Sequence, residues 1–247
     1  MFIFELANRA FWKEYWERAN CTYLISENFR FSDIIKKEYQ EKHFKNFLEI
    51  GGFPGNYSIY ISKYLNVNST LLDFYIDENI IESFFKYNGL DKDKINLIEH
   101  DLFTYEVKEK FDFVLSVGFI EHFKEVDNVI HKHLEFVKEG GTLIMTIPNL
   151  VGATGLAHFL WHRENLHHHN LALMKINAIK KILKDLNITD YEVFYNGSFG
   201  MWLDNYNDKS KLNKFLYDVY KWLMKRVSKV VKIKRIFAPH LVIKINR

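Results

Sequence analysis

The stretch FLEIGGFPGNY, from Phe47 to Tyr57, decides how the fold is predicted. It begins as a short apolar strand, carries an acid at Glu49, and then turns through Gly51, Gly52 and Gly55. Glycine lets a ligand approach the backbone closely, because there is no Cβ to hold it away. The glycines by themselves leave two interpretations open: a ligand-binding loop between a strand and a helix, or a structural turn.

The segments around this stretch alternate between strand and helix. Apolar runs predict strands at 46–50, 69–76, 95–100, 111–117 and 141–147. Each of the first four leads through a short break into a segment that we expect to be helical. Such alternation is typical of a doubly wound, mainly parallel sheet with helices on both faces. We therefore predict a Rossmann-like α/β fold.

The residues before this sheet predict a helical cap. Residues 1–43 contain no strand pattern, and their aromatic residues recur at helical spacing. The residues that form this aromatic face are Phe4, Phe11, Trp12, Tyr15 and Trp16. We expect a cap over 1–43 and a main domain over 44–247.

Two further strands are expected late in the chain. A helical stretch at 170–186 leads to a predicted strand at 190–196. A last strand is predicted at 240–246. Between them lies a basic helical insertion at about 205–236.

The composition excludes several classes of protein. The chain has 247 residues, of which 48% are hydrophobic, enough for one large core. Its single cysteine, Cys21, excludes an intramolecular disulfide framework. The formal net charge of +3 does not require a nucleic-acid partner. Without a secretory signal pattern or a spanning apolar run, we expect a cytoplasmic protein.

Acids stand at the ends of three consecutive predicted strands. Glu49 ends the first, Asp73 the second, with Asp77 as an alternative, and Asp101 the third. A carboxylate at the second position can accept hydrogen bonds from both ribose hydroxyls of an adenosine. Each acid alone is as readily a loop acid or a helix cap, but three in a row favour a ligand site.

In order along the chain, the stretches FLEIGGFPG, TLLDFYID, EHDLF, FDFVLSVGFIEHF and EGGTLIMTIPN resemble the motifs of class I S-adenosylmethionine-dependent methyltransferases. The resemblance is close from residue 44 to about 150. It implies a seven-stranded sheet with an antiparallel last strand, and S-adenosylmethionine across the ends of the first four strands. The residues that it implies for cofactor binding are Glu49, Gly51, Gly52, Gly55, Asp73, Asp101, Leu102, Ser116, Val117 and Gly118.

The glycine loop departs from the family at one position. The family usually has E-x-G-x-G-x-G, and Phe53 stands here in place of the middle glycine. We expect Gly52 to take over the close approach, with Phe53 pointing away from the cofactor. Otherwise the chain keeps the fold as a non-catalytic binding protein. A nicotinamide-dependent oxidoreductase is a third alternative, although its G-x-G-x-x-G is absent.

The predicted reaction is methyl transfer to an O or N atom of a small-molecule acceptor, such as a sugar or other metabolite. Such an acceptor must be positioned and, if it is a hydroxyl or an ammonium, deprotonated. His122, after the fourth strand, and His167, in the histidine-rich stretch 157–170, are the candidate bases. Their alternatives are a residue that holds the loop and a polar surface residue. No metal site is expected, because no metal-binding sequence spacing occurs.

The segment 209–229 predicts a basic amphipathic helix. Its apolar face carries Leu212, Phe215, Val219, Trp222, Leu223 and Val230, with five lysines largely opposite. Such a helix can lie on an anionic membrane surface or bind a phosphorylated acceptor. Alternatively, it packs its apolar face on the sheet. An apolar face free of the core would favour the membrane. The sequence predicts no oligomeric state.

Overall fold

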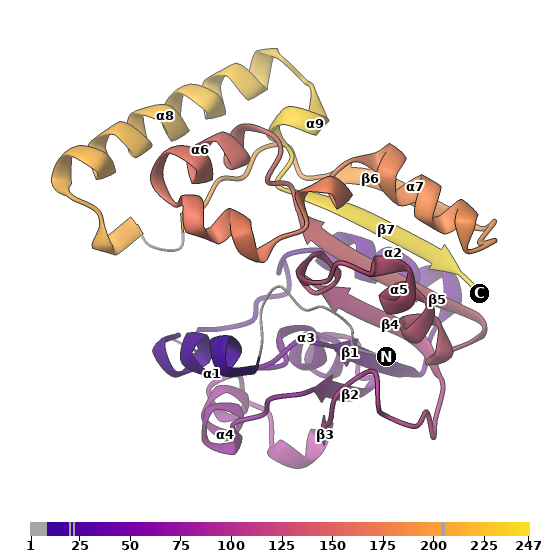
Figure 1. The fold of residues 1–247 in the computed structure, drawn as a ribbon. Coiled ribbons are helices and arrows are strands. Elements are labelled where there is room, and N and C mark those ends of the chain that lie inside the picture. The colour runs from indigo at the N-terminus through magenta and orange to yellow at the C-terminus, as the bar shows by residue number, and fades with distance from the viewer. Residues whose placement is uncertain (1–8, 20, 22, 204–205) are drawn as a thin grey trace. The chain divides into compact units, whose positions relative to one another are not determined.

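The computed structural model describes residues 9–19, 21, 23–203 and 206–247 (Figure 1). The strands are β1 (Asn46–Ile50), β2 (Asn68–Asp73), β3 (Ile95–Glu99), β4 (Phe111–Val117), β5 (Val137–Pro148), β6 (Tyr191–Asn196) and β7 (His240–Asn246). They form one seven-stranded sheet in the order β3-β2-β1-β4-β5-β7-β6. The predicted Rossmann-like fold is thereby confirmed.

The direction of the strands follows from their pairing. β1 pairs in parallel with both β2 and β4, and β2 pairs in parallel with β3. The backbone of Gly140 and Gly141, early in β5, bonds to Arg247, after the end of β7. Asn149, after the end of β5, bonds to Pro239, before β7. β7 therefore runs antiparallel to β5.

The helices are α1 (Arg9–Arg18), α2 (Ser32–Lys42), α3 (Asn56–Tyr64), α4 (Glu78–Tyr87), α5 (Val126–Glu135), α6 (Ala153–Trp161), α7 (Ile176–Asp185), α8 (Lys211–Val230) and α9 (Lys234–Phe237). Short 3-10 helices include η2 (Ile120–His122) and η3 (Arg163–His168). In the part of the chain that the structure describes, none of the helices has the length and apolar character needed to cross a membrane.

The chain divides into two compact units. Within the described residues, the first unit contains the chain up to residue 117, together with 130–144 and 245–247. The second unit contains 118–129 and 145–244. The glycine loop and the ends of β1 to β4 belong to the first unit, and the histidine-rich stretch and α8 belong to the second.

The register brings the carboxyl ends of four strands to one edge of the first unit, which we call the strand-end edge. Ile50, the last residue of β1, lies beside Leu72 on one side and Ser116 on the other. Asp73 lies beside Glu99 of β3. Parallel strands place their carboxyl ends together, so the loops that follow them share this edge.

Two expected helical segments are not helical. Residues 23–31 form turns, because the Asn88 side chain accepts the Ile25 N–H at 2.7 Å and donates to the Tyr23 carbonyl at 3.2 Å. The cap thus has helices only at α1 and α2 among its described residues, and Phe4 lies outside them. Between β3 and β4, residues 100–110 contain no helix. In this segment Asp101 accepts hydrogen bonds from the N–H groups of a tight turn.

Candidate functional site

Glu49 is fully buried and holds the start of α3. Its carboxylate accepts hydrogen bonds from the Ser58 N–H and hydroxyl, both at 2.7 Å, and from the Tyr57 N–H at 3.3 Å. Burial raises the pKa of Glu49 to about 7, and these hydrogen bonds act in the opposite direction. A Cβ on Gly52 would lie 2.3 Å from this carboxylate. Gly52 is therefore required by Glu49 itself, a reason that the loop pattern did not reveal.

Asp73 turns its carboxylate toward the glycine loop. Its Oδ2 accepts the Phe53 N–H at 3.0 Å, and its Oδ1 accepts the Tyr75 N–H at 3.1 Å. Burial raises the pKa of Asp73 to about 6. Each carboxylate oxygen has a second lone pair, so the group can still accept two hydroxyl donors.

The side chain of Phe53 packs away from this hydrogen bond. Its ring is 3% exposed and makes edge-to-face contacts with Trp16 of α1 at 5.3 Å and with Tyr75 at 5.5 Å between centroids. The loop thus presents the Phe53 N–H to Asp73 while the phenyl ring joins an aromatic cluster. A residue in place of the middle glycine is accommodated without pointing its side chain at the carboxylate.

Gly51 and Gly55 complete the loop with backbone that other residues rarely adopt. Their φ angles are 63° and 94°, in the left-handed region. Gly55 donates its N–H to the Gly52 carbonyl at 2.7 Å, and its own carbonyl accepts from Ile59 in α3. The loop is a tight turn that leads directly into the N-terminus of α3, where the Glu49 carboxylate accepts the N–H groups of Tyr57 and Ser58.

The third acid is exposed and forms a turn. Asp101 Oδ1 accepts the Phe103 N–H at 2.9 Å, and the Asp101 carbonyl accepts the Tyr105 N–H at 3.0 Å. Leu102 beside it is buried. Asp77, the alternative to Asp73, caps α4 by accepting two N–H groups of its first turn. Of the two, only Asp73 directs its carboxylate toward the loop.

At the end of β4, Ser116 is buried and Val117 is half-buried. Gly118, the first residue of the second unit, has a φ of 68° and donates its N–H to the Thr146 carbonyl at 2.8 Å. The backbone therefore reverses at Gly118 before it enters η2.

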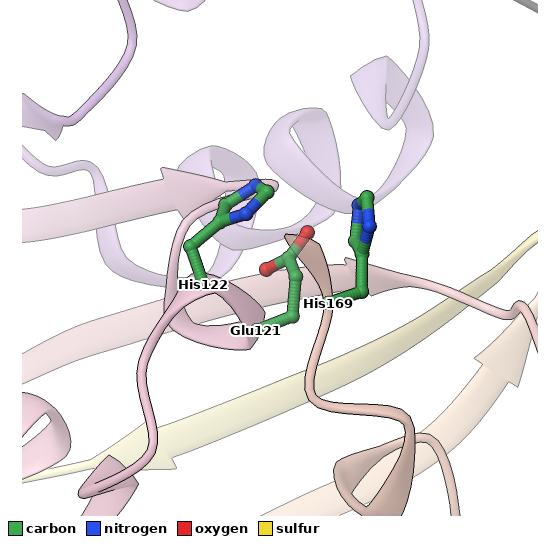
Figure 2. A group of neighbouring side chains, drawn as sticks. All are labelled: Glu121, His122 and His169. Carbon is green, nitrogen blue, oxygen red and sulfur yellow. The ribbon is translucent and has the colours of Figure 1, made fainter. Parts of the chain in front are cut away.

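The second unit contains a buried cluster of one acid and two histidines, Glu121, His122 and His169 (Figure 2). η2 carries Glu121 and His122, and His169 follows η3. Each side chain has one nitrogen or oxygen atom that could bind a metal ion, and these three atoms lie within 4.8 Å of one another. The centroids of the two imidazole rings lie 4.8 Å apart, and Figure 2 shows the Glu121 carboxylate between the two rings. These three residues are called the Glu–His–His cluster below.

Both imidazoles are oriented by backbone carbonyls. His122 Nδ1 lies 2.7 Å from the His168 carbonyl, and His169 Nδ1 lies 2.7 Å from the Asn165 carbonyl. In His169, a neutral imidazole that donates from Nδ1 keeps the lone pair on Nε2. The ring of His122 also hydrogen-bonds to the Gly118 backbone. Burial lowers the pKa of His122 to about 3 and also lowers the pKa of His169. Both rings are therefore neutral at neutral pH.

Glu121 differs from the acids of the strand-end edge. It is 1% exposed, and among the described residues no group hydrogen-bonds to its Oε2. Burial raises the pKa of Glu121 to about 8. A buried carboxyl with an unsatisfied oxygen is costly unless a ligand or a cation completes it.

The histidine that lies beside His122 is not the candidate chosen from the sequence. His167 is exposed on η3, whereas His169, two residues later, lies beside His122. Three consecutive histidines share the same composition and local pattern, so only the fold distinguishes them. The Glu–His pair after β4 was the sequence signal for Glu121.

Known protein families and solved structures include several that are similar to this chain. A model of the methyltransferase domain family matches residues 12–193. Phosphoethanolamine N-methyltransferase 2 from Haemonchus contortus, solved with phosphomonomethylethanolamine and S-adenosylhomocysteine, is similar with a TM-score of 0.59 and 18% identity. The match covers 87% of this chain and 51% of that one, so the chain spans about half the length of that enzyme.

Two further solved structures have a similar fold. A S-adenosylmethionine-dependent methyltransferase from Archaeoglobus fulgidus has a TM-score of 0.54 at 18% identity, over 97% of this chain and 100% of that one. The plantazolicin methyltransferase BpumL, solved with S-adenosylhomocysteine, has a TM-score of 0.54 at 17% identity, over 85% and 80%. No curated protein matches the chain.

The family match covers most of the chain, and the fold agrees with it. It includes the glycine loop, Asp73 and the end of β4, whose motifs carried the resemblance. The cofactor of this family is S-adenosylmethionine. The chain belongs to the class I S-adenosylmethionine-dependent methyltransferases.

Proposed function

We propose that the protein transfers the methyl group of S-adenosylmethionine to an O or N atom of a small-molecule acceptor. The observation that carries the proposal is the strand-end edge, where Asp73 faces a loop of glycines that leads into α3. When bound, the cofactor would supply a methyl group on a sulfonium: the acceptor atom would bond to the methyl carbon in line as the carbon–sulfur bond breaks, and S-adenosylhomocysteine would leave as the neutral thioether. The protein then has to hold and orient both partners.

The residues that the resemblance implies for cofactor binding fit the cofactor by their chemistry. Asp73 would accept the ribose hydroxyls, and Asp101 with Leu102 would contact the adenine. The backbone of Gly51 to Gly55 and of Ser116 to Gly118 would hold the methionine part. Glu49 would act indirectly, because its carboxylate is taken up by α3. The packing of Phe53 against Trp16 and Tyr75 supports a loop that still accepts the cofactor.

The second unit supplies the polar groups proposed for the acceptor. A histidine with a pKa of about 3 takes up a proton poorly at neutral pH, so His122 suits orienting an acceptor better than deprotonating it. His169 has the same neutral character and a similarly oriented ring. We assign acceptor positioning to His122 and His169. His167 remains a candidate base, and its exposure makes it the weaker one.

Titration calorimetry with S-adenosylhomocysteine and with NAD tests the cofactor site. We expect S-adenosylhomocysteine to bind and NAD not to bind. Asp73→Ala should weaken S-adenosylhomocysteine about 100-fold, because two hydrogen bonds to a charged group are lost. Asp77→Ala, which removes a neighbouring acid that only caps a helix, is the matched control and should bind normally. Equal affinity of wild type and Asp73→Ala would refute the assignment.

The choice between an enzyme and a non-catalytic binding protein needs a second measurement. Release of S-adenosylhomocysteine is followed with pools of small hydroxyl-containing and amine-containing acceptors. Acceptor-dependent release supports the proposed transfer and names the class of acceptor. Tight cofactor binding without release in either pool would favour the non-catalytic alternative.

A further inference from the structure

Helix α8 has one face in the core and one face in solvent. Tyr217, Tyr220, Met224 and Val227 pack with α6 and Phe237 in a hydrophobic cluster of the second unit. Figure 1 shows α6 and α8 side by side. This packing fixes which side of α8 turns outward.

The outward side is apolar. Val230 is 83% exposed, Leu212 67%, Phe215 63% and Trp222 55%. All six apolar residues on which the amphipathic pattern rests are exposed, so the alternative that this face packs on the sheet is wrong. Leu156, Phe159 and Leu160 add exposed apolar area on the adjacent α6. Water-exposed apolar patches of this kind mark interaction sites.

Basic side chains lie beside this apolar face and not only opposite it, because Trp222 and Val230 line one hollow together with Lys225, Arg226 and Lys229. Asp218 is the only acid between residues 209 and 235. Near the end of α8 lies a hollow of about 400 Å³, whose lining includes Lys225, Lys229, Lys232 and Lys234. Lysines around an apolar stripe match the phosphates of a lipid headgroup layer.

We propose that the apolar face of α8, with the exposed residues of α6 and the flanking lysines, docks the protein on an anionic lipid bilayer. The apolar side chains enter the boundary between headgroups and acyl chains, and the lysines contact lipid phosphates. A second copy of the chain is a poorer occupant, because it would bring the same lysines to the rim of the contact. The proposal is independent of the identity of the acceptor.

Co-sedimentation with lipid vesicles tests this surface. The full chain is mixed with vesicles of phosphatidylcholine alone, or of phosphatidylcholine with phosphatidylglycerol. We expect binding to the anionic vesicles, weakened by salt, because the lysine contribution is screened. The exposed pair Lys225→Glu with Lys229→Glu should lower the partition coefficient about tenfold. Lys180→Glu with Lys184→Glu, the same spacing on exposed positions of α7, is the matched control.

A second pair of variants tests the apolar stripe. Trp222→Glu should lower vesicle binding about tenfold, whereas Tyr87→Glu, similarly exposed on α4, should leave it unchanged. Thermal unfolding confirms that each variant is folded. Binding that is equal for anionic and neutral vesicles, or unaffected by the α8 variants, would overturn the proposal. So would a concentration-dependent dimer that Trp222→Glu dissociates without any vesicle binding.

A separate observation concerns the Glu–His–His cluster. Glu121 is buried with an unsatisfied oxygen, and each histidine has its Nδ1 against a backbone carbonyl. An imidazole that binds a metal through one ring nitrogen usually donates a hydrogen bond from the other, which fixes the orientation of the ring. Two imidazoles and one carboxylate suit divalent transition metals and leave coordination positions open.

We infer that Glu121, His122 and His169 form a site for a divalent transition metal ion, in which case the two histidines would act on an acceptor through the bound ion. The sequence-based expectation of no metal rested on the spacing of residues along the chain. Such spacing could not indicate His169, because it comes from a segment distant from Glu121 and His122 in the sequence. The rival arrangement is a protonated Glu121 that remains neutral among the two imidazoles. Only the first arrangement binds added metal.

Calorimetric titration of the metal-free protein with ZnCl₂ and MnCl₂ separates them. We expect one ion per chain, with affinity reduced about tenfold or more in Glu121→Gln and in His169→Ala. His131→Ala, which alters the exposed His131–Glu135 pair on α5, is the control. Binding of S-adenosylhomocysteine is measured on the same samples, so failure of the cofactor site is seen separately. Absence of metal binding, or equal binding by wild type and Glu121→Gln, would overturn the inference.

Discussion

The strand-end edge of the first unit and the Glu–His–His cluster of the second both bury carboxyl groups, but in different ways. Glu49 accepts three hydrogen bonds from α3, and Asp73 accepts N–H groups through both oxygens. Glu121 leaves Oε2 without a donor among the described residues. The first two acids each hold backbone N–H groups of neighbouring residues, whereas one oxygen of the third accepts no such bond from the residues that the structure describes.

The pKa values follow this difference. Burial raises the pKa of Asp73 to about 6, of Glu49 to about 7 and of Glu121 to about 8. Backbone N–H groups stabilise the ionised form and oppose the desolvation of a buried acid. Glu121 has the highest value and the fewest such donors. Burial raises the pKa of all three acids, and the number of hydrogen-bond donors around each carboxylate accounts for the order of the values.

The largest expected effect comes from breaking the strand-end edge at Glu49. Glu49→Ala leaves the N–H groups of Tyr57 and Ser58 buried and unpaired, so it should cost about 3 kcal/mol of unfolding free energy. Urea denaturation followed by circular dichroism measures the loss. A cost below about 1 kcal/mol would mean that water replaces the carboxylate.

The pH dependence of cofactor binding sharpens the contrast at Asp73. The ionised carboxylate accepts hydroxyl donors, and with a pKa of about 6 it becomes protonated as the pH falls below that value. The affinity for S-adenosylhomocysteine should therefore fall toward tenfold per pH unit below about 6. Calorimetry between about pH 4.5 and about pH 8, in steps of roughly half a pH unit, measures this dependence. Asp73→Asn, which has no titrating group there, should show a flat profile.

The Glu–His–His cluster is tested by two neighbouring histidines. His169→Ala removes a ring beside His122 and should lower the rate of methyl transfer about tenfold. His167→Ala removes an exposed ring and should change this rate less than about twofold. The measurement is S-adenosylhomocysteine release with the acceptor pool that turns over. The opposite ranking would restore His167 as the base.

The smallest expected effect compares a buried acid with an exposed one in the same structural role. Asp77 caps α4 through two N–H groups, as Glu49 holds α3, but at the surface. Asp77→Ala should cost about 1 kcal/mol, the usual value for an N-cap. Urea denaturation under the conditions used for Glu49→Ala gives the direct comparison. Equal costs would show that burial adds nothing at Glu49.

Several features could be predicted because they are encoded locally. The pattern of a strand followed by a glycine turn is contained within about ten residues. The bounds of β1 and β4 agree with the predicted ones. The acids at the ends of β1 and β2 could be placed for the same reason. The absent helix between β3 and β4 shows the limit, because the Asp101 turn uses hydrogen bonds that the apolar pattern does not register.

The sequence by itself determined the sheet, the family and the acids of the strand-end edge, since strand ends and turns depend on neighbours along the chain. The tertiary structure decided which histidine lies beside His122, because that contact joins segments that are far apart in the sequence. It also decided that the apolar face of α8 is exposed. Helical periodicity defines which residues share a face, but only packing determines whether that face meets the core or the solvent.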